Sequence, residues 1–181
     1  VLLVLADGMG GMEQGEIAAQ AVIDVARDLY LKSPRPVPNT GRLLCDIINR
    51  THDLLVEDLP PEQERSSFGT TAVLCLVQNG EAHWAHVGDS RLYAFRSGRC
   101  IYRTRDHSYV EGLFRQGLIN EDERSRHPRR NQITQFIGCT RYRPEVALAT
   151  PIALQENDVL LLCSDGLWDP VRESELADLL G

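Results

Sequence analysis

Residues 159–169 have the sequence Val159-Leu-Leu-Leu-Cys-Ser-Asp-Gly-Leu-Trp-Asp169, and the chain opens with Val1-Leu-Leu-Val-Leu-Ala-Asp-Gly-Met-Gly-Gly11. Each stretch is an apolar run that breaks at an Asp-Gly pair, which predicts a buried strand with a carboxylate at its end. A third strand-like segment, residues 82–87, leads in the same way to Asp89. An Asp-Gly pair is also common in ordinary turns. However, a carboxylate at the rim of a core loses part of its hydration and needs a compensating partner. Three acidic strand ends therefore favour a shared cation.

The composition indicates one globular domain. The chain has 181 residues, 43% of them hydrophobic, which suffices for a sizeable core within residues 1–181. Its net charge of −7 does not fit a nucleic-acid-binding protein or one that binds an anionic membrane surface. The five cysteines are widely spaced, so we expect free thiols in a reducing compartment, the cytoplasm. The chain begins inside an expected strand and stops after an expected helix, so we expect both ends to be cut from a longer domain.

Two amphipathic helices are expected after the first strand. The Pro-rich segment 33–38 ends the first helix. Thr40 is the expected cap of the second helix, and Pro60-Pro61 ends it. Two successive helices predict an antiparallel pair that lies on a sheet. Their expected apolar faces consist of Ile17, Ala18, Ala21, Val22, Val25 and Leu29 in the first helix, and Leu43, Leu44, Ile47, Ile48, Thr51, Leu54 and Leu55 in the second.

The rest of the chain alternates between strands and short helices. An antiparallel meander is expected between residues 70 and 105, with tight turns at Asn79-Gly80 and Ser97-Gly98. Ser108, at capping-box spacing from Glu111, opens a short helix, and a second short helix begins near Asn120. The expected strands are 70–77, 81–87, 91–95, 100–103, 145–149 and 158–163, and a last helix lies near 173–180.

The acidic strand ends suit a hard metal ion. Carboxylates and backbone carbonyls favour Mg²⁺ or Mn²⁺, whereas zinc would need Cys or His at close spacing. Gly8 lets the backbone carbonyl turn inward as a ligand. Two such ions would activate a water molecule and clamp a phosphoryl group. Other phosphate chemistries fit poorly: a dinucleotide fingerprint that starts at Gly8 fails at Glu13, and no Arg stands six residues after any Cys to serve a cysteine nucleophile.

Short motifs follow one another along nearly the whole chain: Asp7-Gly-Met-Gly-Gly11, Phe68-Gly-Thr-Thr-Ala72, Val87-Gly-Asp-Ser-Arg91, Thr104-Arg-Asp-His-Ser108, His127-Pro-Arg-Arg-Asn131 with Ile133-Thr134 and Ile137-Gly138, and Cys163-Ser-Asp-Gly-Leu-Trp-Asp169. In this order they resemble the protein phosphatase 2C-like (PPM) family, in particular its bacterial branch. The resemblance implies an α+β fold, a four-layer αββα sandwich in which two antiparallel sheets are flanked by antiparallel helix pairs. It also implies a phosphoserine/phosphothreonine protein phosphatase that uses a metal-activated water and forms no covalent intermediate.

The resemblance implies roles for particular residues. Asp7 would bridge two Mn²⁺ or Mg²⁺ ions, Gly8 would give its carbonyl, and Asp165 would bind one ion, so that Asp7 and Asp165 are the expected catalytic residues. Asp89 and Asp169 match positions that hold a third, weaker ion in relatives. The partners would be phosphoproteins made by a Ser/Thr kinase, without nucleic acid or membrane. A catalytically silent phosphoprotein-binding or regulatory module of the same fold is the alternative.

Three features depart from the family pattern. An upstream Arg and acidic motif would precede Val1, and a downstream Asp-Asn motif would follow Gly181. Met9 stands where many eukaryotic relatives place a His that is proposed as a general acid.

The segment 108–138 corresponds to the flap of the family, which lies beside the cleft and is tied to substrate choice. Its arginines either meet acidic or phosphorylated partners or form a solvated face: Arg124, Arg126, Arg129 and Arg130. Outside the flap, His107 and Arg91 are expected to be hydrogen-bonded supports of the site, and Trp84 and Trp168 are expected to belong to the core.

Overall fold

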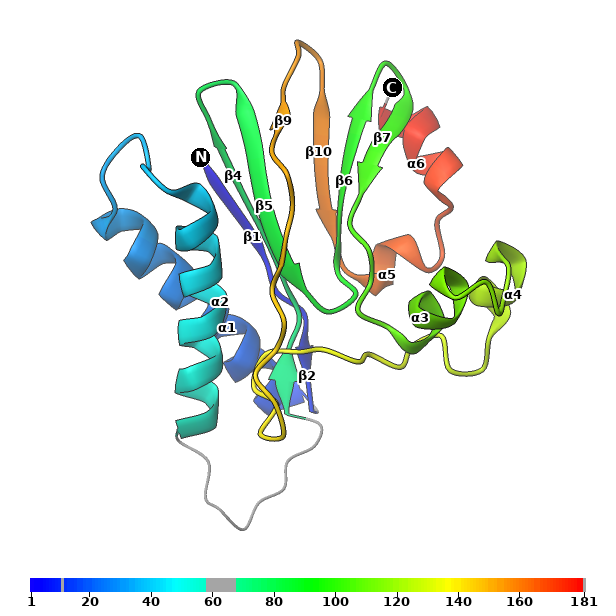
Figure 1. Ribbon diagram of the computed structural model, residues 1–181, viewed down its shortest axis with the longest axis horizontal. Helices are drawn as coiled ribbons and strands as arrows, with labels where there is room; N and C mark the ends of the chain where they lie inside the picture. The colour runs from blue at the N-terminus through cyan, green and yellow to red at the C-terminus, as the bar shows by residue number, and fades with distance from the viewer. Residues whose placement is uncertain (11, 58–67, 181) are drawn as a thin grey trace.

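The computed structural model of the chain describes residues 1–10, 12–57 and 68–180. It has a mixed α/β fold with antiparallel sheets between helices (Figure 1). In spatial order the first sheet consists of β1 (Leu2–Leu5), β4 (Ala72–Gln78), β5 (Glu81–Val87) and β8 (Ala147–Leu148), with β9 (Ile152–Ala153) also paired to β5. The second sheet consists of β10 (Val159–Cys163), β6 (Arg91–Arg96) and β7 (Arg99–Arg103), and β2 (Gly8–Met9) pairs with β3 (Gly69–Thr70). The helices are α1 (Met12–Lys32), α2 (Thr40–Glu57), α3 (Tyr109–Arg115), α4 (Glu121–Arg126), α5 (Asp165–Trp168) and α6 (Glu173–Leu180).

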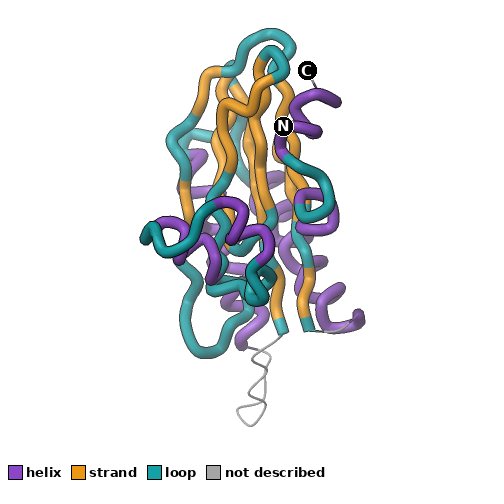
Figure 2. Tube along the Cα trace, turned by 90° about the vertical axis from the view of Figure 1, so that its right-hand side faces the viewer, coloured by secondary structure: helices purple, strands orange, loops and turns teal. Residues whose placement is uncertain are grey.

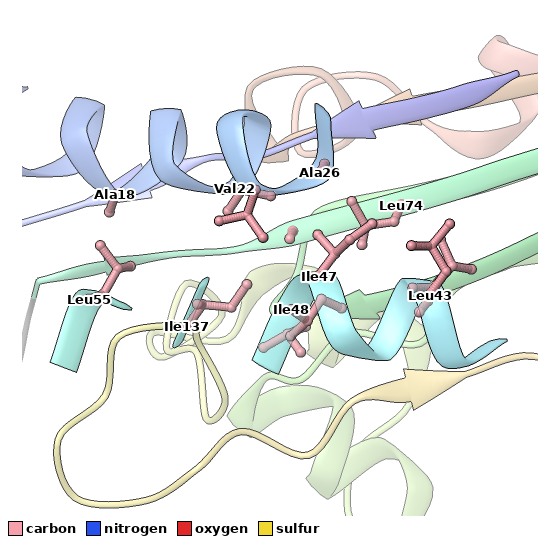
Figure 3. Packing of buried hydrophobic residues seen from close by; sticks show 14 of the residues in the cluster. Ala18, Val22, Ala26, Leu43, Ile47, Ile48, Leu55, Leu74 and Ile137 are labelled. Atoms are coloured by element: carbon pink, nitrogen blue, oxygen red, sulfur yellow. The ribbon is translucent and has the colours of Figure 1, made fainter. Parts of the chain in front are cut away.

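Helices α1 and α2 cover one face of the first sheet, as predicted (Figure 1). Figure 3 shows Val22 of α1 and Ile47 of α2 packed beside Leu74 of β4. Each side chain of this size contributes about 1.5–3 kcal/mol when it is fully buried. Two residues of the predicted apolar faces are instead on the surface, because Ile17 is 55% exposed and Leu54 is 43% exposed. They stand at the margins of their faces, where helical spacing alone does not separate the flank from the core.

The predicted cap of α2 is wrong by one residue. Thr40 is the first residue of the helix, and the Asn39 side chain accepts a hydrogen bond of 2.9 Å from the N–H of Arg42. Asn therefore caps the helix, in agreement with its stronger preference for this position. Helix α2 ends at Glu57, and the predicted stop at Pro60-Pro61 lies outside the described residues.

The predicted meander consists of two hairpins that belong to different sheets. Both turns are confirmed, because φ is positive at Asn79-Gly80 and at Ser97-Gly98, as in a type I′ turn. However, β4 and β5 lie in the first sheet, whereas β6 and β7 lie in the second. The chain crosses between the sheets at Gly88, which has a φ of 102°. A Cβ at Gly88 would lie 2.5 Å from the side chain of Thr71, so only glycine fits this crossing.

Two further apolar clusters hold the second sheet. Trp84 and Cys75 of the first sheet pack with Leu92 of the second, and the Trp84 ring lies 4.6 Å from that of Tyr102. On the other side of the second sheet, the cluster around Tyr93 includes residues of α6. Within the described part of the chain, no helix has the length and apolar character needed to cross a membrane.

The last third of the chain contains one unpredicted helix. The predicted strand 145–149 is reduced to β8, while β10 and α6 match their predictions. The pair Asp165-Gly166 was interpreted as a turn, but it opens α5, one helical turn long. Figures 1 and 2 place α3 and α4 toward the end of the sheets at which β1, β5 and β10 finish. This end of the sheets carries the predicted site.

Candidate functional site

Three strands finish at one end of the two sheets, and an aspartate follows each of them (Figure 1). Strands β1 and β5 run in the same direction because both pair antiparallel with β4. Asp7 follows β1 after one residue, Asp89 lies in the crossing after β5, and Asp165 follows β10. The carboxylates that the sequence places at strand ends therefore gather at one end of the fold.

Backbone contacts fix the segment that carries Asp7. The carbonyl of Asp7 accepts hydrogen bonds from the N–H of Thr71 at 2.9 Å and from the hydroxyl of Thr70 at 3.0 Å. Next to it, Gly8 lies against Gly15 of α1, where a Cβ on Gly8 would come within 1.9 Å of the Gly15 carbonyl oxygen. A side chain at Gly8 would therefore push α1 away. Gly15 was not predicted as a functional position, although a glycine in the first turns of a predicted helix is a signal of close packing.

The carboxylates influence each other electrostatically. Burial raises the pKa of Asp7, and the charge of Asp165 raises it further. Burial raises the pKa of Asp89 to about 7, and the negative charges of Asp106, Asp165 and Asp7 act in the same direction. Like charges that are partly removed from water destabilise one another, and a bound cation reverses this effect.

The chemistry of these groups fits a hard divalent cation. The predicted donors are carboxylate oxygens, together with the carbonyl of Gly8. In the described ranges no three Asp, Glu, His or Cys side chains converge into a complete ligand set. Mg²⁺ is typically bound through one or two carboxylates and keeps several of its waters, so a complete set of protein ligands is not required.

Asp169 lies one helical turn after Asp165. Its N–H donates a 2.9 Å hydrogen bond to the carbonyl of Asp165, so the two side chains share one side of α5. Its carboxylate lies 3.5 Å from the guanidinium of Arg130 in the flap. Asp169 is not among the charges that raise the pKa of Asp7 or Asp89. Its role as a ligand of a third ion stays a prediction.

A buried ion pair supports the acidic residues. Arg91 donates to both carboxylate oxygens of Asp106, at 2.8 and 2.6 Å, and both side chains are less than a tenth exposed. The Arg91 guanidinium also lies 3.6 Å from the centre of the Trp168 ring. The supporting position expected for Arg91 is confirmed. Asp106 was not singled out, although it stands inside the quoted motif Thr104-Arg-Asp-His-Ser108.

His107 holds the crossing that carries Asp89. Its ring Nδ1 accepts a hydrogen bond of 3.3 Å from the N–H of Gly88, and the backbone N–H of His107 donates to the Gly88 carbonyl at 2.9 Å. Burial, together with the charge of the nearby His86, lowers the pKa of His107 to about 4, so the ring is neutral and Nδ1 remains an acceptor. A hydrogen bond of 2.7 Å between Ser90 and Thr71 ties the other end of the crossing to the first sheet. His107 is therefore a support, as expected.

The arginines of the flap differ in their surroundings. Arg124 is buried and forms ion pairs with Glu111 at 2.5 Å and with Glu121 at 2.6 Å. It joins α3 to α4, so neither alternative from the sequence, a partner contact or a solvated face, applies to it. Arg129 lies over the ring of Tyr109, 3.6 Å from its centre, and Arg126 is exposed. Sequence patterning did not identify Arg124 as buried because its partner Glu111 lies in a different helix.

The chain resembles known proteins over nearly its whole length. The family model described as Protein phosphatase 2C matches residues 1–180. The serine/threonine phosphatase stp of Listeria welshimeri is 31% identical over 185 residues, which cover 99% of this chain and 71% of that protein. The crystal structure of the serine/threonine phosphatase PstP/Ppp of Mycobacterium tuberculosis has a TM-score of 0.85 and 32% identity, and the match covers 98% of this chain and 73% of that one. The catalytic domain of PstP in complex with two manganese ions has a TM-score of 0.79 and 30% identity, with coverage of 98% and 72%.

Proposed function

The chain belongs to the protein phosphatase 2C family, and from this premise we propose that Asp7, Gly8, Asp89 and Asp165 form its active site, with Asp169 as a further metal ligand. It is a metal-dependent serine/threonine phosphatase that uses two Mn²⁺ or Mg²⁺ ions and acts on phosphoproteins. One observation carries the assignment of the site: burial raises the pKa of Asp89, and the charges of Asp106, Asp165 and Asp7, which lie near it, act in the same direction. Cations bound among these carboxylates would offset their mutual repulsion at neutral pH.

The residues of the chain orient the reacting groups. When bound, the ions lower the pKa of a water molecule and neutralise charge on the phosphoryl oxygens. The hydrogen bonds from Thr70 and Thr71 fix the backbone of Asp7, so its carboxylate needs little reorganisation during turnover. His107 fixes Gly88, and Asp89 with it, in the same way.

Two buried thiols, those of Cys75 and Cys163, are poor nucleophiles. Burial raises the pKa of Cys75 to about 12 and that of Cys163 to about 11, so both thiols are protonated at neutral pH. The thiolate is the nucleophilic form of cysteine. The state of these two thiols supports direct hydrolysis by water without a covalent intermediate.

We further propose that residues 1–181 form one domain with the four-layer arrangement of its family. The layers would be α1 with α2, the first sheet, the second sheet, and α5 with α6. Three separate apolar clusters support this arrangement, because each contains residues from two neighbouring layers.

The substrates are proposed to be products of a Ser/Thr kinase in the cytoplasm. The five cysteines are free, which suits a reducing compartment. The net charge of −7 argues against nucleic acid or an anionic membrane as a partner.

The experiment measures hydrolysis of p-nitrophenyl phosphate and of a phosphothreonine peptide with Mn²⁺, with Mg²⁺ and in excess chelator. Asp7→Ala is compared with Asp24→Ala, a control on the exposed side of α1. We expect activity only with metal, a loss of at least about 100-fold for Asp7→Ala, and no loss for the control. Full activity in chelator would disprove the metal mechanism. A silent binding module would bind the peptide without turnover, which separates it from the enzyme.

A further inference from the structure

A cavity of about 360 Å³ lies between the flap helices α3 and α4, the hairpin β6-β7, and helices α5 and α6. It is adjacent to the proposed active site, because Asp106 and Asp169 both line its wall. Five arginines, from β6, β7, α4 and two loops, also line it: Arg91, Arg103, Arg124, Arg130 and Arg172. The function proposed above assigns no role to this cavity.

The arginines of the cavity fall into two groups. Arg91 and Arg124 are saturated by close ion pairs of 2.5 to 2.8 Å with their carboxylates. Arg103, Arg130 and Arg172 have only long ion pairs, with N to O distances of 3.7, 3.5 and 3.7 Å. A charge-assisted hydrogen bond between these groups is normally 2.7 to 2.9 Å long. The second group therefore keeps strong hydrogen-bonding capacity for another acceptor.

The wall contains one more unused donor. Trp168 lines the cavity, and its indole N–H is buried without a hydrogen-bond partner among the described residues. A buried donor without an acceptor is costly, and a ligand with acceptor atoms removes that cost. The face of the same ring is covered by Arg91, which adds positive charge next to the indole. Tyr93 and Val110 supply an apolar part of the wall.

From these contacts we propose that the cavity binds a second anionic group of the phosphoprotein substrate, a phosphate or a carboxylate near the phosphoresidue that is hydrolysed. This proposal rests on the proposed function of the neighbouring site. The planar guanidinium matches both anions through paired hydrogen bonds. Arg103 and Arg172 would serve specificity alone, because they do not contact the carboxylates of the active site, whereas Arg130 pairs with Asp169.

The test compares three sets of phosphothreonine peptides. The three sets differ in one residue, which is alanine, glutamate or phosphoserine. Within each set, this residue stands at one of the three positions before or after the phosphothreonine. The enzyme variant is Arg103→Gln with Arg172→Gln. The matched control is Arg27→Gln with Arg42→Gln, two exposed arginines of α1 and α2 that are also paired with neighbouring carboxylates. The measured quantity is kcat/KM with Mn²⁺, and p-nitrophenyl phosphate reports on the active site alone.

We expect the wild type to prefer at least one acidic peptide over its alanine counterpart. The double variant should lose about tenfold in kcat/KM for that peptide, which corresponds to one charged hydrogen bond. Its rates with the alanine peptide and with p-nitrophenyl phosphate should stay unchanged, as should all rates of the control. The glutamate and phosphoserine sets show which anion the cavity takes.

Two outcomes would overturn the proposal: no preference of the wild type for any acidic peptide, or equal losses of the double variant with acidic and alanine peptides. Because Arg103 is partly buried, Arg172→Glu is measured as well, at a side chain that is 86% exposed. This charge reversal should weaken turnover of the acidic peptide without lowering the melting temperature. A wild-type enzyme that hydrolyses p-nitrophenyl phosphate but shows no preference for acidic peptides would refute only anion binding in the cavity. A wild-type enzyme that is inactive on every substrate would refute the proposed function.

Discussion

Replacing Asp89 with asparagine should stabilise the metal-free chain at pH 8. In the folded chain the pKa of Asp89 is about 7, raised from 3.8 by burial and by the charges of Asp106, Asp165 and Asp7. At about 1.4 kcal/mol for each pKa unit, the ionised carboxylate lowers the free energy of unfolding by at most about 4 kcal/mol. Asparagine has the same shape without the charge, so it should recover most of this free energy.

The effect should depend on pH in one direction. Between pH 4 and pH 7 the folded chain binds more protons than the unfolded chain, because the pKa of Asp89 is higher in the folded state. The free energy of unfolding of the wild type therefore falls as the pH rises through this window. Below pH 4 the carboxyl is protonated in both states, and the advantage of Asp89→Asn should vanish.

Urea unfolding of the wild type and of Asp89→Asn, in chelator at pH 5 and at pH 8, measures both effects. We expect the variant to be more stable at pH 8, by about 2–4 kcal/mol, and the gap to shrink by more than half at pH 5. Asp158→Asn is the matched control of opposite sign, because hydrogen bonds from Arg96 lower the pKa of Asp158 to about 2. This control should be less stable than the wild type. An Asp89→Asn variant that is less stable at pH 8, or equally stabilised at both pH values, would refute the reasoning.

Three other outcomes are expected. Asp7→Ala should abolish paired metal binding in a calorimetric titration, whereas Asp89→Ala should keep two ions and mainly slow turnover; an Asp7→Ala chain that binds two ions tightly would show that the bridging residue is wrongly assigned. His107→Asn should keep most of kcat, because its amide oxygen can accept the hydrogen bond from Gly88, while His107→Leu should lose about tenfold; equal rates for the two variants would contradict this role. Trp84→Ala, which empties the centre of the contact between the sheets, should cost about 3–5 kcal/mol in urea unfolding, and a cost below about 1 kcal/mol would mean that the sheets are loosely packed.

Local signals in the sequence were sufficient to predict most of the helices, strands and turns. The turn at Asn79-Gly80 was predictable because its two residues adopt positive φ with little strain. The long helix α1 was predictable because its apolar residues repeat over several turns and a Pro-rich segment follows. The gathering of carboxylates at one end of the sheets was predictable because a carboxylate after a buried strand is unusual without a partner.

Other features depend on contacts that a local pattern does not contain. The division of the meander into two sheets at Gly88 follows from a close approach to Thr71, which is distant in sequence. Arg124 is buried only because Glu111 of another helix neutralises it. Helix α5 is too short for its periodicity to be recognised, so Asp165 was placed at a turn. For Gly88 and Arg124, a residue of another element decides the outcome.

The crossing at Gly88 makes the spacing of the carboxylates depend on how the two sheets are aligned. Asp7 follows β1 of the first sheet, Asp165 follows β10 of the second, and Asp89 is one of the three residues that join the two sheets. A small slide of one sheet over the other, at the contact between Trp84 and Tyr102, would change all three distances together. Selection for a tighter or looser contact between the sheets would thus retune metal affinity without replacing any ligand. Differences in ion preference among relatives should therefore be sought in the residues between the two sheets.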